Sequence, residues 1–272
     1  MRQRLNLIIL TLLMELICFW PVWRWYYFRV INSPDELTGL LSIVTALFFI
    51  WLKRNKASTY PKSHLYLTIA LNFTYALTYS FSPPLIRGII AFSAIAVTLA
   101  DFFLKGNFKS SIWGLFVLGL PLIPTLQFYL GFPLRWLTAF IAVPLINLSG
   151  FSISQSGACL NWSGKIVAID APCSGVKMLW AGLYLLLTLT TIHDFKFTKT
   201  VIALFLTTII IILGNILRSI TLFYLEAGIV PAPGWLHQVI GLIAFGFVSS
   251  FIFFATMKLK GGMKCNDDTI FS

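Results

Sequence analysis

The sequence has 272 residues, of which 58% are hydrophobic and 11% are charged, and its mean hydropathy is +0.87. So large an apolar fraction excludes an ordinary soluble domain and indicates a chain surrounded by lipid. The net charge of +11 does not by itself indicate a nucleic-acid partner, because basic residues in such a chain usually flank the cytoplasmic ends of helices.

The chain begins with Arg2 and Arg4 and a long apolar run, as a secretory signal peptide does. No small-residue cleavage site follows, and the run continues into the aromatic stretch 20–27. Aromatic side chains gather where membrane helices meet the lipid headgroups. We therefore expect a retained first helix that ends in an outer aromatic belt.

Apolar segments long enough to cross a bilayer, which takes about 20 residues, recur along the chain. A shorter segment, 133–149, contains Pro133 and Pro144, and we expect it to lie along the outer surface or to re-enter. Residues 1–272 show no repeat or linker and are expected to form a single polytopic membrane domain. The eight predicted crossing helices are 5–22, 37–52, 65–82, 85–104, 112–130, 174–192, 199–223 and 238–257.

The distribution of basic residues predicts the orientation of these helices. If 133–149 does not cross, the cytoplasmic side holds Arg2, Arg4, Lys53, Arg54, Lys56, Lys62, Lys105, Lys109, Lys196, Lys199, Lys258, Lys260 and Lys264. The outer side then holds Arg24, Arg29, Arg87, Arg135, Lys165 and Lys177, and Arg218 lies within a helix. This asymmetry is the positive-inside pattern, and it predicts cytoplasmic N- and C-termini.

One sizeable outer loop is predicted, at about 150–172. Alternating apolar residues at 150–154 and 166–169 flank a turn at 161–164. This pattern indicates a small β-hairpin.

A cysteine follows this loop directly, in the Ala-Pro-Cys-Ser-Gly sequence at 171–175 that enters the sixth helix. At a helix N-terminus, unpaired N–H groups favour a thiolate, which is the nucleophilic form of Cys173. Two alternatives are an inert small hydrophobic residue and a disulfide to Cys159 on the oxidising side. No Cys-x-x-Cys spacing is present, which argues against a zinc site and against a disulfide oxidoreductase. We expect no metal and no cofactor. The four cysteines are Cys18, Cys159, Cys173 and Cys265.

A charged residue lies inside the seventh predicted helix. Arg218 is about five residues from its outer end, roughly 7–8 Å below that end. Charges inside a membrane usually face a cavity and have a partner, which favours a functional role. Asn215 lies three residues earlier on the same helical face. Alternatively, Arg218 extends to the outer headgroups or pairs with Glu226.

A histidine lies at the outer start of the eighth helix. His237 can move a proton near neutral pH, although a single interfacial histidine is more often merely solvated. His64 and His193 fall on the cytoplasmic side. Three helices thus bring Cys173, Arg218 and His237 to the same outer level. This set predicts a nucleophile, an oxyanion-stabilising cation and a general acid/base for acyl transfer.

The chain resembles the exosortases of bacteria and the archaeosortases of archaea. The similarity is specific over about 150–245, whereas the first 130 residues agree only in being helical and membrane-spanning. The sequence departs from the family pattern at 176–178, where Val-Lys-Met follows the Cys-Ser-Gly motif in place of a more neutral polar residue. The resemblance therefore does not indicate which sorting motif is recognised. The matching residues are Cys173-Ser174-Gly175, Asn215 with Arg218, and His237 followed by Gly241.

This resemblance implies an all-α integral membrane protein that acts as a cysteine protease or transpeptidase, a sortase analogue on an unrelated fold. It would work at the outer face of the cytoplasmic membrane. Its protein partner would be the C-terminal sorting signal of a secreted protein, made of a short motif, a transmembrane helix and a basic tail, as in PEP-CTERM. The lipid bilayer is the other partner, and no nucleic acid is expected.

The resemblance also implies a role for each residue. Cys173 would attack the peptide carbonyl, Arg218 would stabilise the oxyanion or orient the thiolate, and His237 would protonate the leaving amine. The candidate supporting residues are Asn215, Ser174 and Asp170.

Two other classes of protein fit the same sequence. One is a non-enzymatic or transporter-like membrane protein in which Arg218 binds an anion and Cys173 is structural. A transporter should show related halves, and the sequence has no internal symmetry. The other is an outer-facing acyl or glycan transferase that uses the same thiol.

Overall fold

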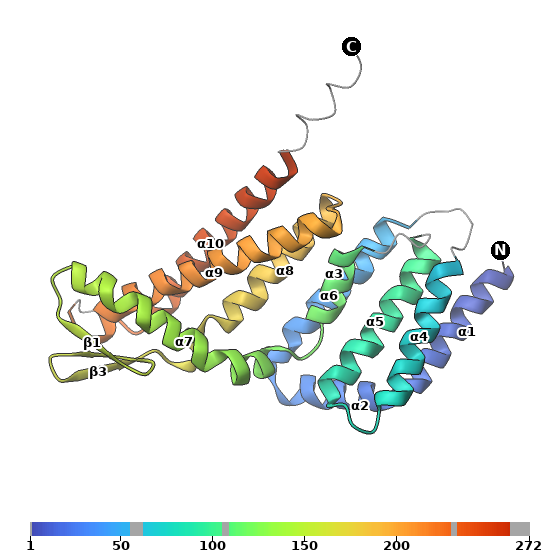
Figure 1. Cartoon of the computed structure of the whole chain (residues 1–272), viewed down its shortest axis with the longest axis horizontal. Coiled ribbons are helices and arrows are strands. Elements are labelled where there is room, and N and C mark those ends of the chain that lie inside the picture. Colours follow the sequence, from blue (N-terminus) through green and yellow to red (C-terminus); the bar gives the residue numbers. More distant parts are fainter. Residues whose placement is uncertain (1, 55–61, 105–108, 230–232, 262–272) are drawn as a thin grey trace, which may run out of the picture. The chain divides into compact units, whose positions relative to one another are not determined.

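The computed structural model describes residues 2–54, 62–104, 109–229 and 233–261. It is mostly helical with one small β-sheet, as Figure 1 shows, and it separates into two compact units. Unit 1 comprises Met1–Leu122 with Thr190–Thr200, and unit 2 comprises Ile123–Leu189 with Val201–Ser272. Lys56, Lys105, Lys264 and Cys265, on which some of the predictions above depend, lie outside the described residues. The expectation of one membrane domain stays a prediction.

Unit 1 is built from helices in the first half of the chain. Aromatic and small side chains, among them Phe19, Tyr75 and Ala91, form a buried core between α2, α4 and α5. Its elements are α1 (Arg2–Cys18), α2 (Trp20–Asn32), the 3-10 helix η1 (Pro34–Glu36), α3 (Leu37–Leu52), α4 (Lys62–Thr78), α5 (Pro84–Phe103) and α6 (Ser110–Leu118).

Five helical segments in the described part of the chain are long and apolar enough to cross a membrane. Together with two shorter apolar helices, Ile9–Cys18 and Val176–Ile192, they indicate a multi-pass membrane protein. The predicted number of eight crossings and the cytoplasmic termini stay predictions. The five segments are Pro34–Leu52, Pro84–Phe103, Ile123–Leu148, Phe197–Glu226 and Leu236–Gly261.

Two predicted helix boundaries are wrong. The first helix ends at Cys18, and the aromatic stretch belongs to a separate helix, α2. The outer aromatic belt stays a prediction. The predicted helix 112–130 is divided, because α6 ends at Leu118 and α7 (Ile123–Leu148) begins after a break that contains Pro121. The segment 133–149 is therefore not a separate short segment, because nearly all of it belongs to the 26-residue α7.

Unit 2 contains three helices that pack closely. α8 (Val176–Ile192), α9 (Phe197–Glu226) and α10 (Leu236–Gly261) share a buried apolar cluster. A Cβ on Gly182 would lie 2.5 Å from Ile211 Cδ1, and one on Gly214 would lie 2.1 Å from Val248 Cγ2. A side chain at either glycine would collide with the neighbouring helix, so both glycines allow the helices to pack closely.

The β-sheet of unit 2 has three antiparallel strands in the order β1 (Ile153–Ser156), β2 (Cys159–Trp162) and β3 (Lys165–Ala168). Ser163 and Gly164 make the second turn, with φ of 48° and 79°. The predicted single hairpin is corrected, because β1 pairs with β2 and not with β3. The outer position of the sheet stays a prediction.

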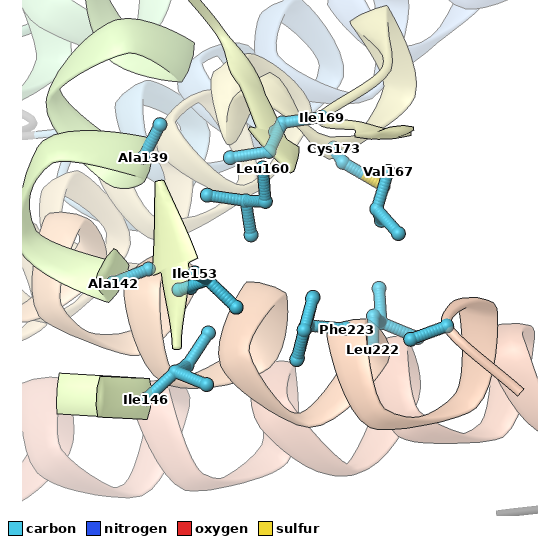
Figure 2. Packing of buried hydrophobic residues seen from close by; sticks show 11 residues of the cluster. Ala139, Ala142, Ile146, Ile153, Leu160, Val167, Ile169, Cys173, Leu222 and Phe223 are labelled. Carbon is cyan, nitrogen blue, oxygen red and sulfur yellow. The ribbon is translucent and has the colours of Figure 1, made fainter. Parts of the chain in front are cut away.

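One face of the sheet packs against α7 and α9. Ile153, Leu160 and Val167 are buried in a cluster with Ala142 of α7 and Phe223 of α9, as Figure 2 shows. Cys173 belongs to the same cluster. The sheet and these two helices thus form the frame that holds the cysteine.

Candidate active site

Cys173 lies in a single turn of 3-10 helix, η2 (Ala171–Ser174), and is 6% exposed. Its N–H donates to the carbonyl of Asp170 at 2.9 Å. Gly175, in the left-handed region with φ of +84°, separates this turn from the start of α8 at Val176. The expected position at the N-terminus of a long helix is therefore corrected, because Cys173 lies three residues before α8 begins.

Polar side chains from two helices hold this turn. Asn215 of α9 donates through Nδ2 to the carbonyl of Cys173 at 3.1 Å. Gln127 of α7 accepts a hydrogen bond from the Ser174 hydroxyl at 2.8 Å and donates to the carbonyl of Ala171 at 3.3 Å. The turn is thus fixed on both sides of the thiol, which is a requirement for a preorganised site.

An imidazole and a guanidinium both lie close to the sulfur atom of Cys173. His237 Nε2 and Arg218 Nη2 each lie 3.7 Å from Cys173 Sγ. Arg218 lies farther from the end of its helix than expected, because α9 continues to Glu226, eight residues or about 12 Å beyond it. The structure brings together the three side chains that the sequence analysis singled out.

An acidic residue faces the other nitrogen of the imidazole. Glu226 Oε1 lies 3.3 Å from His237 Nδ1. Among the described ion pairs, Glu226 is paired with this histidine and not with Arg218, contrary to the alternative above. A carboxylate at Nδ1 fixes the tautomer that presents Nε2 to the sulfur.

Burial raises the pKa of the Cys173 thiol above its ordinary value. The Arg218 guanidinium opposes this shift, whereas the negative charges of Glu226 and Asp170 add to it. Burial thus favours the neutral thiol over the thiolate. Desolvation, the largest cause of this shift, opposes the thiolate that a helix terminus would favour.

The remaining predicted residues have clear positions. Asp170 precedes η2, and its carbonyl accepts the N–H of Cys173. Cys159 and Cys173 are both free, which contradicts the disulfide alternative. Across the described residues, no group of three or more His, Cys, Asp and Glu side chains could hold a metal ion.

Sequence analysis missed the residues that support the turn from α7. Gln127 and Thr138, which lies 3.4 Å from Asn215 Nδ2, were treated as parts of apolar segments. A glutamine in such a segment was the available signal, because a polar side chain in an apolar helix needs a hydrogen-bonding partner.

Fold and site together define a multi-pass membrane protein in which a thiol, an imidazole and a guanidinium meet beside a small sheet. The family model for transmembrane exosortases matches residues 29–254, so the chain belongs to the transmembrane exosortase family. The predicted resemblance is confirmed, and the match extends well beyond 150–245. Membership indicates a membrane transpeptidase of the cysteine type. Comparison with curated proteins and with solved structures gave no match.

Proposed function

We propose that this protein cleaves the C-terminal sorting signal of exported proteins, of the PEP-CTERM kind, at the outer face of the cytoplasmic membrane. The observation that carries the proposal is the contact of one sulfur with two groups: Cys173 Sγ lies 3.7 Å from both His237 Nε2 and Arg218 Nη2. A nucleophile, a proton carrier and a cation at these distances are the parts that acyl transfer needs.

Attack begins from the thiol. The proton of Cys173 passes to Nε2 of His237 while the sulfur attacks the carbonyl carbon of the scissile peptide bond. The carbonyl oxygen becomes an oxyanion, which the Arg218 guanidinium stabilises. Glu226, 3.3 Å from Nδ1, stabilises the imidazolium that forms.

Collapse of this intermediate breaks the C–N bond. His237 gives its proton to the leaving amine, and a thioester remains on Cys173. An amine of a lipid or glycan, or water, then attacks the thioester, and its proton returns to the sulfur. The first product is the apolar helix with its basic tail, and the second is the exported protein.

The test uses an epitope-tagged exported protein of the same cells that ends in a short motif, an apolar helix and a basic tail, called the reporter below. Replacing Cys173 with alanine should lower processing of the reporter by about 10⁴-fold or more, because the nucleophile is lost. Immunoblotting of the uncleaved reporter measures this change. A membrane-extracted variant that elutes and unfolds like the wild type shows that the fold is intact.

The matched control is Cys159→Ala, which removes a free thiol near the same sheet. Its processing should stay close to that of the wild type. Normal processing by Cys173→Ala would show that the thiol has no chemical role, as a transporter or structural protein requires. Equal losses in both variants would point to a shared structural role.

A further inference from the structure

An apolar groove runs along unit 2 between α9 and α10, with a volume of about 630 Å³. Several of its side chains are more than half exposed, among them Leu217 at 63% and Phe247 at 66%. The α9 residues that line it are Ile210, Leu213, Gly214, Leu217, Arg218 and Thr221, and the α10 residues are Ile240, Ile243, Ala244, Phe247, Val248 and Phe251.

The lining has the periodicity of a surface that receives a helix. On each of the two helices, the lining positions recur at spacings of three and four residues over twelve residues, which is about 16 Å of helix. α9 and α10 run in opposite directions, as Figure 1 shows, and they line the groove together, with Gly214 of α9 packed against Val248 of α10. Two such apolar helix faces, side by side, form a groove that fits a third helix of about three turns.

The groove is continuous with the candidate active site. Arg218 lines the groove and also lies 3.7 Å from Cys173 Sγ. It is the charged member of the lining, and it lies near the end of the groove formed by Thr221 and Ile240. An occupant must therefore be apolar over most of its length and must end in a polar segment beside the sulfur.

We propose that this groove binds the apolar helix of the sorting signal and thereby places the peptide bond before that helix over Cys173. This inference rests on the proposed function, which supplies a substrate with a helix next to the cleaved bond. The helix enters sideways from the lipid, where van der Waals packing between helices is the main attraction. Arg218 meets the polar segment at which the helix begins.

A photo-crosslinking residue tests the occupant. It replaces Phe247 in the groove or, as a matched control, Leu242, which is 71% exposed on the same helix but does not line the groove. The Cys173→Ala background retains uncleaved reporter. Crosslinking at Phe247 should recover the reporter through its apolar helix about tenfold more than crosslinking at Leu242. Equal recovery, or crosslinks only to phospholipid or to a second copy of the chain, overturns the proposal.

Filling the groove gives an independent measurement. Ile243→Trp adds bulk in the lining, whereas Leu242→Trp adds the same bulk beside it. Ile243→Trp should raise the reporter concentration needed for half-maximal processing about tenfold, and Leu242→Trp should not. Alkylation of Cys173 by iodoacetamide should be equal in both variants, which excludes a damaged site.

The two proposals fail separately. If processing depends on Cys173 but both groove measurements are negative, the groove is not the docking site and the proposed function stands. If the groove crosslinks to the apolar helix of the reporter but processing does not depend on Cys173, the proposed function fails, and only the binding of that helix in the groove stands.

Discussion

The thiol of Cys173 lies among charges of both signs, and its reactivity depends on their balance. Burial raises its pKa, Arg218 lowers it, and Glu226 and Asp170 raise it. A buried thiol that stays protonated needs a base at the moment of attack. His237, 3.7 Å away, is in position to serve as that base.

Substitutions of the surrounding charges should move this pKa in opposite directions. Iodoacetamide reacts with the thiolate, so the pH midpoint of Cys173 alkylation reports its pKa. Arg218→Gln removes the positive charge that favours the thiolate, and the midpoint should move to higher pH. Glu226→Gln removes a negative charge, and the midpoint should move to lower pH. Shifts of the same sign in both variants would contradict the electrostatic account.

Glu226 is also expected to affect turnover through His237. Glu226→Gln keeps the shape of the side chain but removes the charge that stabilises the imidazolium, so kcat for the reporter should fall by about 10²- to 10⁴-fold. KM should change little, because Glu226 would not touch the substrate. The pH profile of kcat should shift as well, which a purely structural role would not cause. A normal kcat would remove Glu226 from the mechanism.

At the scale of elements, Gly175 connects the cysteine turn to α8. Its φ of +84° suits glycine, and a Cβ there would lie 2.9 Å from Cγ of Asn215, whose amide holds the carbonyl of Cys173. A side chain at this position would therefore strain the backbone and displace Asn215 together. The geometry around the thiol depends on this one residue being glycine.

Gly175→Ala should lower the free energy of unfolding by about 1–3 kcal/mol and reduce processing of the reporter. Gly164→Ala is the matched control, since Gly164 has a φ of +79° but open space around it. The control should show only the backbone strain and should retain processing. Thermal unfolding in detergent and the reporter assay measure the two effects. Equal behaviour of the variants would mean that contact with Asn215 is unimportant.

The elements around α7 show where hydropathy fails as a predictor. Hydropathy alone treats residues 112–130 as one span, and the signal for the break after Leu118 is Pro121, which hydropathy does not weigh. The strand pairing was ambiguous for a related reason. Alternation shows which residues share a face of a sheet, but it does not show which strands are neighbours.

For the whole molecule, the charge pattern predicts that the sheet lies outside and that the residues after α8 lie in the cytoplasm. Single-cysteine variants Ser156→Cys and Thr198→Cys, both at exposed positions, test this orientation. A membrane-impermeant maleimide should label the first variant in intact cells and the second only after permeabilisation. The opposite labelling pattern would place the candidate active site in the cytoplasm.

Composition and residue type alone indicated that the chain is a membrane protein, and they singled out Cys173, Arg218 and His237 as candidate reactive groups. Neither conclusion needs coordinates, because hydropathy is a sum over residues and a motif is a local pattern. The tertiary structure decided that Glu226 faces His237, that Gln127 holds the cysteine turn, and that burial raises the pKa of the Cys173 thiol. These properties depend on burial and on distances between residues far apart in the chain, and a linear sequence contains neither.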